Sequence, residues 1–181
     1  MITFEVSKDI HLKMLQESDV AKLFEVVDSN RLYLRKWLPW LDFNKSVDDS
    51  LTYIKTNHKQ YSNNLGFNCG VFFSGELVGM CGYHPIDHLN KKVVLGYWIA
   101  QQAQGQSIIT KCVEYLINYA FDTLKLNKVS IPAAEYNYKS QAVSERLGLV
   151  KEGIEREAEF LYDQYVNHIH YSVLCSEWKR C

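Results

Sequence analysis

The chain has 181 residues, of which 47% are apolar and 23% charged, so it has the length of a single domain over residues 1–181 and enough apolar material for a sizeable core. Its 20 basic and 21 acidic residues leave no basic tract, which argues against a nucleic-acid-binding surface. No apolar run approaches ~18 residues, and the charged start lacks the core of a signal peptide, so no membrane role is expected. The five cysteines have no C-x-x-C spacing and fit a reducing cytoplasm, where we expect the protein to act.

Local patterns in residues 1–62 predict two strands followed by two helices. Residues 2–6 and 10–15 have the pattern of short strands on either side of a tight turn. Helical periodicity over residues 17–30 predicts a helix with Ser18 as its N-cap. A second helix is expected over residues 46–62, where the opening letters SVDD have the spacing of a capping box.

The sequence period changes from helical to alternating in the middle of the chain. Residues 66–85 contain two predicted strands around a turn at Ser74–Gly75, and residues 93–100 form a third, so we expect an antiparallel meander. The helical period returns from Ile108, where one apolar stripe predicts an amphipathic helix. The stripe consists of Ile109, Cys112, Val113, Leu116, Ile117, Ala120, Phe121 and Leu124.

The last part of the chain combines a strand, a helix and a long hairpin. Residues 128–134 predict the strand, and residues 140–149 predict a helix that Gly148 ends with a left-handed cap. Residues 153–163 and 165–175 predict the hairpin. This order indicates a mixed α+β fold with helices packed against a sheet. The last strand is expected to be exposed, which would let it pair with a second copy in a homodimer.

The stretch QQAQGQSIIT, residues 101–110, connects a predicted strand to the amphipathic helix. The first turn of a helix has N–H groups without intrahelical partners and the positive end of the helix dipole. These groups would be able to converge on a diphosphate. However, Gly105 is the only glycine and no G-K-[ST] follows, so the residues taken alone favour an ordinary strand-to-helix turn.

The segment GYWIAQQAQGQSIITKCVEYLINYAF resembles the acetyl-CoA-binding segment of the GCN5-related N-acetyltransferase (GNAT) family. The family signature [Q/R]-x-x-G-x-[G/A] falls on residues 102–107, where Ser107 replaces the usual glycine or alanine. We expect this serine to be tolerated because it is small and able to cap a helix. The segments LYLRKWLPWL, NYKSQAVSERLGLVKEG and EREAEFLYDQYVNHIHYSVLCSEW resemble the RimJ/RimL-type branch, which acetylates ribosomal proteins. The resemblance covers about residues 10–178.

The resemblance implies an acetyl-CoA-dependent N-acetyltransferase with a GNAT-type fold. That fold has a central, largely antiparallel, twisted sheet flanked by helices, with one splayed strand pair. The implied reaction is direct attack of an amine on the thioester while both substrates are bound, without a metal. The implied acceptor is a protein N-terminal α-amine. Two alternatives stay open, namely a small amine such as a polyamine, an amino acid or an aminoglycoside-like compound, and a sensor that binds acetyl-CoA without turnover.

The family also implies which residues hold the cofactor. A bulge in the GYWIA strand would aim an N–H group at the acetyl carbonyl. Pro132 falls on the strand that splays from it, where a missing N–H leaves nothing unpaired, although an irregular strand end fits equally well. The implied cofactor-binding residues are Trp98, Ile99, Ala100, Gln104, Gly105, Gln106, Ser107, Ile108, Ile109, Thr110, Asn137 and Ser140.

Three residues are candidates for proton transfer and leaving-group stabilisation. By resemblance, Ser140 hydrogen-bonds the departing sulfur while Asn137 holds the cofactor arm. The same residues also fit a plain helix N-cap. Tyr138 is a rival proton donor. Glu159 matches the proposed base of the branch, and the demand on it is modest because an α-amine has a pKa of about 7.7–8.0.

The acceptor side is assigned from the two segments that flank the expected cleft. Strict alternation would place Glu155, Glu157 and Glu159 on one strand face, where three carboxylates attract a cationic amine or form a solvated edge. His168 and His170 also share a face, and packing or a proton relay suits them better than a metal, since no third ligand is apparent. The candidate substrate-binding residues are Arg35, Trp37, Glu157 and His170.

Overall fold

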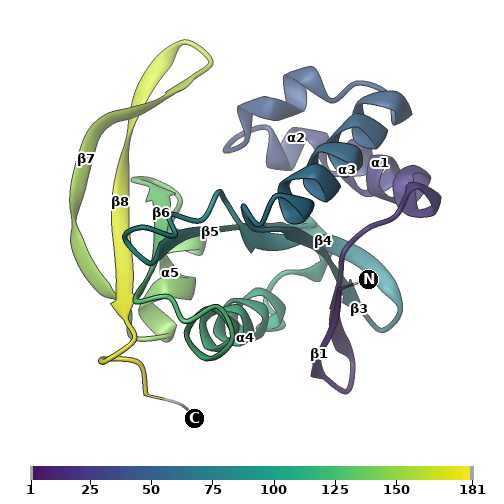
Figure 1. Ribbon diagram of the computed structural model, residues 1–181. Coiled ribbons are helices and arrows are strands. Elements are labelled where there is room, and N and C mark those ends of the chain that lie inside the picture. Colours follow the sequence, from purple (N-terminus) through teal and green to yellow (C-terminus); the bar gives the residue numbers. More distant parts are fainter. Residues whose placement is uncertain (1, 180–181) are drawn as a thin grey trace.

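The computed structural model describes residues 2–179 and is built on an eight-stranded sheet in the order β1-β2-β3-β4-β5-β6-β8-β7 (Figure 1). Neighbouring strands are antiparallel except for β5 and β6, which are parallel. This arrangement confirms the predicted mixed α+β fold. The strands are β1 (Thr3–Ser7), β2 (Ile10–Lys13), β3 (Asn68–Phe73), β4 (Glu76–Tyr83), β5 (Lys92–Ile99), β6 (Lys128–Ala134), β7 (Val150–Leu161) and β8 (Gln164–Leu174).

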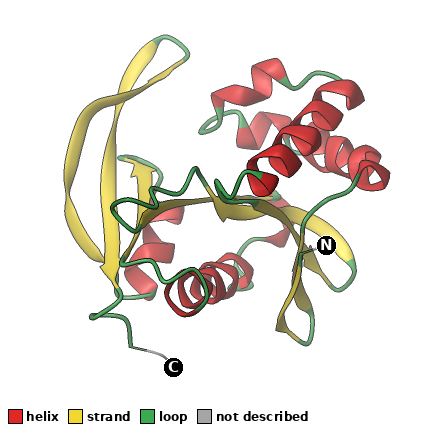
Figure 2. Cartoon of the chain, viewed as in Figure 1, coloured by secondary structure: helices red, strands yellow, loops and turns green. Residues whose placement is uncertain are grey.

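Helices cover both faces of the sheet, so the fold has three layers (Figure 2). One layer contains α1, α2 and α3, and the opposite layer contains α4 and α5 (Figure 1). Short 3₁₀ turns, named η1 to η3, precede α1 and α3 and follow β5. The helical elements are η1 (Glu17–Asp19), α1 (Val20–Ser29), α2 (Arg31–Leu34), η2 (Pro39–Phe43), α3 (Val47–Ser62), η3 (Gln101–Ala103), α4 (Ile108–Asp122) and α5 (Tyr138–Arg146).

The two faces of the sheet are buried in two separate apolar clusters. The larger cluster packs the predicted stripe of α4 against the sheet, and every stripe residue within the helix is buried. Leu124 lies beyond the end of α4 and is only partly buried against this cluster. The smaller cluster includes Leu23, Leu34 and Ile54 from the first helices, packed on Phe72 and Met80. Because each face has its own helical cover, the sheet is fixed between the two layers.

Strands β5 and β6 separate after a short parallel contact. They pair only over Lys92–Val94 and Lys128–Ser130. Beyond these residues, β5 stays paired with β4 on one side, and β6 stays paired with β8 on the other. Pro132 lies in the separated part of β6 and pairs in regular register with His170. The predicted splay is therefore present, and Pro132 belongs to a regular strand with no β5 residue opposite it.

The start of α1 differs from the prediction. The helix begins at Val20, and Ser18 lies within η1, where no capping bond by its side chain is recorded. The Asp19 carboxylate accepts the Gln16 N–H at 2.8 Å and pairs with Lys13 at 2.9 Å. This closed turn places Asp19, rather than Ser18, immediately before the helix.

The terminal hairpin is inserted with its second strand inward. Strand β8 lies between β6 and β7, so the expected pairing of an exposed β8 with a second copy is wrong. The outer edge of the sheet at this end is β7. Its register shifts twice, between Lys151 and Gly153 and between Glu155 and Glu159. Such irregularities interrupt the row of free backbone groups that edge pairing requires.

Replacement of Ser144 by alanine is expected to stabilise the protein. Ser144 is fully buried in α5, and its hydroxyl has no hydrogen-bond partner within residues 2–179. The Ser144→Ala change removes an unpaired buried group and raises helix propensity, so we expect the free energy of unfolding to rise by about 1 kcal/mol. Urea unfolding would measure this value. A loss of stability would contradict the assignment of an unpaired hydroxyl.

Candidate active site

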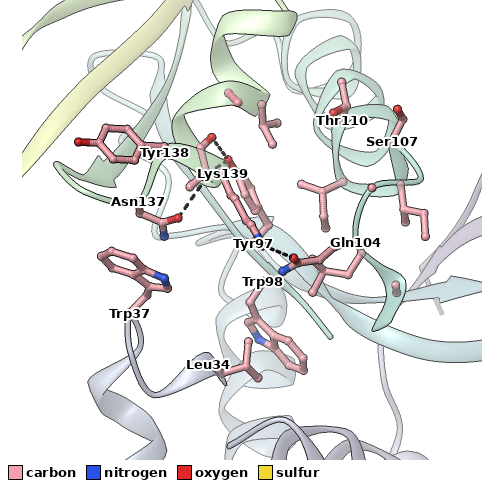
Figure 3. A pocket seen from close by; sticks show the side chains of 18 of the residues that line it. Leu34, Trp37, Tyr97, Trp98, Gln104, Ser107, Thr110, Asn137, Tyr138 and Lys139 are labelled. Atoms are coloured by element: carbon pink, nitrogen blue, oxygen red, sulfur yellow. Dashed lines mark hydrogen bonds between the residues drawn. The ribbon is translucent and has the colours of Figure 1, made fainter. Parts of the chain in front are cut away.

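A cavity of about 680 Å³ lies where β5 and β6 separate (Figure 3). We call it the splay cavity. Its lining comes from the end of β5, the following loop, the first turn of α4, one side of α5, and α2 with the residues that follow it. The predicted residues that line it are Trp37, Trp98, Ile99, Gln104, Gly105, Ser107, Ile108, Ile109, Thr110, Asn137, Tyr138 and Ser140. The predicted residues outside its lining are Arg35, Ala100, Gln106, Glu157, Glu159 and His170.

The loop before α4 and the first turn of α4 contain a continuous row of free amides beside the splay cavity. The first hydrogen bond of α4 runs from the Lys111 N–H to the Ser107 carbonyl at 3.1 Å. The N–H groups of residues 105–110 have no acceptor within the described chain. We call this row the amide cradle. It coincides with the positive end of the α4 dipole and is suited to an anion such as a diphosphate.

Two left-handed residues shape the amide cradle. Gly105 has a φ of 77° and Ser107 a φ of 57°. Ser107 occupies the N-cap position of α4, but its side chain makes no cap bond. A left-handed backbone explains why glycine suits this position, and serine there costs about 1–2 kcal/mol. The sequence therefore keeps the loop shape at some expense of stability.

The free edge of β5 supplies amides that point into the gap. The Ala100 N–H donates to the Val78 carbonyl at 2.7 Å, and the His84 N–H donates to the Val94 carbonyl at 2.9 Å. In an antiparallel ladder the hydrogen-bonded residues alternate, so even-numbered residues of β5 face β4. The Tyr97 and Ile99 N–H groups therefore face β6 and the gap. Of the predicted stretch 98–100, only Ile99 offers its amide to the splay cavity.

The β-bulge expected in β5 is absent. The pairing of β4 with β5 is continuous from Leu95 to Ile99. The nearby register shift occurs one strand away, between Val71 and Phe72 of β3, and leaves Val78 as the extra residue of β4. The amide of Ile99 is exposed by the splay, without any local distortion of β5.

Asn137 caps α5 and also lines the splay cavity. Its side-chain oxygen accepts the Ser140 N–H at 3.2 Å, which makes it the N-cap of α5. The residue also lines the splay cavity, so its amide nitrogen can face a ligand. Tyr138, the first residue of α5, is 69% exposed, and its ring points away from Tyr97 in Figure 3.

Tyr97 is a polar site residue that the sequence analysis missed. Its hydroxyl donates to the Ser140 carbonyl at 2.9 Å and lies 3.1 Å from the Ser140 Oγ. Burial raises the pKa of Tyr97, so the phenol keeps its proton at neutral pH. The alternation of β5 placed Tyr97 and Ile99 on one face, but no local pattern indicated the contact with α5.

Two cations that the sequence analysis also missed line the splay cavity. The Lys139 ammonium donates to the Gln104 Oε1 at 2.8 Å, and the Arg146 guanidinium donates to the Thr110 Oγ1 at 3.2 Å. The two cations are seven residues apart on α5, a spacing that places them on one helix face. No described lining residue is acidic, so the cavity carries positive charge beside the amide cradle.

Glu155 and Glu159 of the hairpin lie outside the splay cavity, and each is paired with a histidine. His168 Nε2 is 3.2 Å from Glu159, and His170 Nε2 is 2.6 Å from Glu155. The expected regular alternation is wrong because the register of β7 shifts between Glu155 and Glu159. Glu157 lies in this shift with a φ of 50°, and its N–H donates to the Asn167 side chain at 2.9 Å.

Arg35 connects the hairpin tip to the region after α2. Its guanidinium pairs with Asp42 at 2.7 Å and lies 3.9 Å from the centre of the Tyr162 ring. The Tyr162 hydroxyl donates to the Arg35 carbonyl oxygen. The hydrogen bonds from Arg35 lower the pKa of Asp42. These contacts fix the hairpin against the helical layer that carries Trp37, so the placement of Arg35 favours a supporting role over direct contact with substrate.

The comparisons with known proteins identify the class. The model of the acetyltransferase (GNAT) domain matches residues 9–150. The chain therefore belongs to the GNAT family and is an acetyl-CoA-dependent N-acetyltransferase. This membership agrees with the splayed strand pair and the amide cradle described above.

Individual relatives extend over nearly the whole chain. The Bacillus subtilis (strain 168) protein named "Putative ribosomal N-acetyltransferase YdaF" is 37% identical over 180 residues, covering 99% of this chain and 98% of its own. The ribosomal-protein-serine acetyltransferase of Escherichia coli (strain K12) is 29% identical, covering 90% and 91%. The structure of RimL, the ribosomal L7/L12 α-N-protein acetyltransferase in complex with coenzyme A, superposes with a TM-score of 0.92 at 24% identity, covering 96% and 98%.

No group of three or more His, Cys, Asp or Glu side chains in residues 2–179 is arranged to hold a metal ion. None of the described helices combines the length and the apolar character that crossing a membrane requires.

Proposed function

We propose that the protein acetylates the N-terminal α-amine of a protein of the ribosomal type, with acetyl-CoA as donor and direct attack while both substrates are bound. The observation that carries the donor half is the amide cradle, which opens into the gap between two parted strands. Support for the acceptor half comes from the names of the two relatives that match nearly the full chain.

In this proposal the cofactor binds along the loop and the gap. The amide cradle holds the diphosphate, and Lys139 and Arg146 add positive charge on the opposite wall. The pantetheine arm follows the free edge of β5, as an added strand would. The Ile99 N–H then donates to the acetyl carbonyl oxygen, where negative charge develops as the amine attacks.

The leaving group and the base are assigned to two different elements. Ser140, at the start of α5, donates a hydrogen bond to the sulfur as the carbon–sulfur bond breaks. Glu159, on β7, accepts the proton of the amine, directly or through one water. His168 contacts Glu159 at 3.2 Å and helps to fix its orientation. The acceptor enters between the hairpin and Trp37.

A panel of acceptors tests the proposal. Release of free thiol from acetyl-CoA would be measured with unblocked peptides that begin with different residues, the same peptides with blocked α-amines, and free amines including spermidine. We expect unblocked peptides to react and blocked ones to be inactive. Preference for free polyamines over every peptide would overturn the acceptor assignment. A spermidine N(1)-acetyltransferase is among the relatives, at 25% identity over 88% of this chain. Absence of turnover with every amine would favour a sensor.

A further inference from the structure

The Tyr97 side chain crosses from β5 to the first turn of α5 and contacts both oxygens of Ser140. Its hydroxyl donates to the Ser140 carbonyl at 2.9 Å and is 3.1 Å from the Ser140 Oγ. The Tyr97 phenol has one O–H, and it donates that O–H to the Ser140 carbonyl. The Ser140 hydroxyl is therefore the donor in the contact between the two hydroxyl groups. The Ser140 side chain is therefore held in one direction, at the wall of the splay cavity.

Strand β5 also presents the Ile99 amide two residues further along. Because Tyr97 and Ile99 are both odd-numbered residues of this strand, their side chains share a face and their amides share the free edge. Tyr97 thus fixes α5 to the strand whose open edge faces the same cavity. Strand β5 therefore positions two groups of the proposed function. It carries the Ile99 N–H, which faces the acetyl oxygen, and through Tyr97 it holds the Ser140 hydroxyl, which faces the sulfur.

We propose that Tyr97 is a positioning residue that holds the Ser140 hydroxyl at the wall of the splay cavity, from which its O–H turns to the sulfur of the departing coenzyme A. The inference rests on the proposed function, in which Ser140 contacts that sulfur. When the carbon–sulfur bond breaks, its electron pair passes to sulfur, and the Ser140 O–H turns from Tyr97 to the thiolate. The Tyr97 O–H turns from the carbonyl to the Ser140 Oγ, which makes the serine a stronger donor. Neither hydroxyl loses its proton, and the proton of the amine leaves through Glu159.

The experiment compares Tyr97→Phe, Ser140→Ala and the double variant. The rate of acetyl transfer would be measured in a single turnover with the best acceptor of the panel, because this rate reports the chemical step. Tyr97→Phe keeps the ring and removes the hydroxyl, so we expect transfer to slow about five- to tenfold. Binding of coenzyme A, measured by calorimetry, should stay within about twofold. The double variant should be no slower than Ser140→Ala alone, because Tyr97 acts through Ser140.

A matched control separates positioning from loss of stability. The buried Tyr83 hydroxyl donates to the Leu116 carbonyl of α4, as Tyr97 does to a carbonyl of α5. Tyr83→Phe should lower the melting temperature and leave the single-turnover rate unchanged. The Ser144→Ala variant is the control for Ser140→Ala, because it also removes a serine hydroxyl from α5.

The possible outcomes distinguish the inference from the function on which it rests. If Ser140→Ala slows transfer and Tyr97→Phe does not, the inference is wrong and the proposed function stands. If Tyr97→Phe slows transfer further in the Ser140→Ala background, Tyr97 acts independently of Ser140 and the inference is also wrong. If Ser140→Ala itself leaves transfer unchanged, the leaving-group assignment of the proposed function fails, and the inference fails with it.

Discussion

Replacement of Gly105 by aspartate should weaken coenzyme A binding by at least about 100-fold, equivalent to about 2.7 kcal/mol. Gly105 lies in the amide cradle with a φ of 77°, and open space surrounds the position of an added Cβ. The Gly105→Asp change therefore creates no clash. It places a carboxylate beside the amides that are proposed to hold the diphosphate, where like charges repel. Calorimetric titration with coenzyme A would measure the loss.

Gly148 provides the matched control for this change. It also has a positive φ, 70°, with nothing near an added Cβ, but it follows the end of α5 and does not line the splay cavity. Gly105→Asp and Gly148→Asp should each lower stability by about 1–2 kcal/mol, because both place a side chain in the left-handed region. Only Gly105→Asp should weaken binding. Equal affinities of the two variants would show that the loop does not hold the cofactor.

Replacement of Glu159 by glutamine should lower turnover by about 100-fold and leave coenzyme A affinity nearly intact. Glutamine keeps the size of the side chain and can still contact His168, but it cannot take a proton from the amine. Glu159 lies on the hairpin and outside the splay cavity, so cofactor contacts are not disturbed. Steady-state rates with the best peptide, together with calorimetry, would separate the two effects.

Glu155 is the corresponding control on the same strand. It contacts His170 at 2.6 Å, as Glu159 contacts His168, and its side chain is 59% exposed. Glu155→Gln should change turnover by no more than about threefold, since an exposed pair of this kind contributes little. Equal losses in both variants would point to the general charge of the hairpin. Full activity of Glu159→Gln would show that Glu159 is not the base.

Most elements follow from short-range patterns in the sequence. The capping box at Ser46 and Asp49 forms as predicted, with the Asp49 carboxylate accepting the Ser46 N–H at 2.9 Å. The apolar stripe of α4 is buried, and Gly148 ends α5 in a left-handed conformation. Each of these features depends on residues within a few positions of one another. The predicted N-cap Ser18 instead lies in η1, where the Asp19 carboxylate accepts the Gln16 N–H.

The functional site also combines features that the sequence indicated with features that only the packing of distant elements explains. The loop from Gln104 to Thr110 was assigned through its resemblance to the GNAT signature, because the residues alone fit an ordinary strand-to-helix turn. The left-handed conformation of Ser107 was not predicted. Lys139 and Arg146 look like ordinary surface cations in the sequence, and only the packing of α5 beside α4 brings them to the splay cavity.

The sequence by itself determined the succession of strands and helices and their buried faces, because hydrophobic period and capping act between near neighbours. The tertiary structure alone decided that β8 lies inside β7, that Ile99 rather than Ala100 has a free amide, and that Tyr97 contacts Ser140. The last pair is separated by 43 positions. Strand order and hydrogen-bond parity are set by the partner strand across the sheet, and no local pattern carries that information.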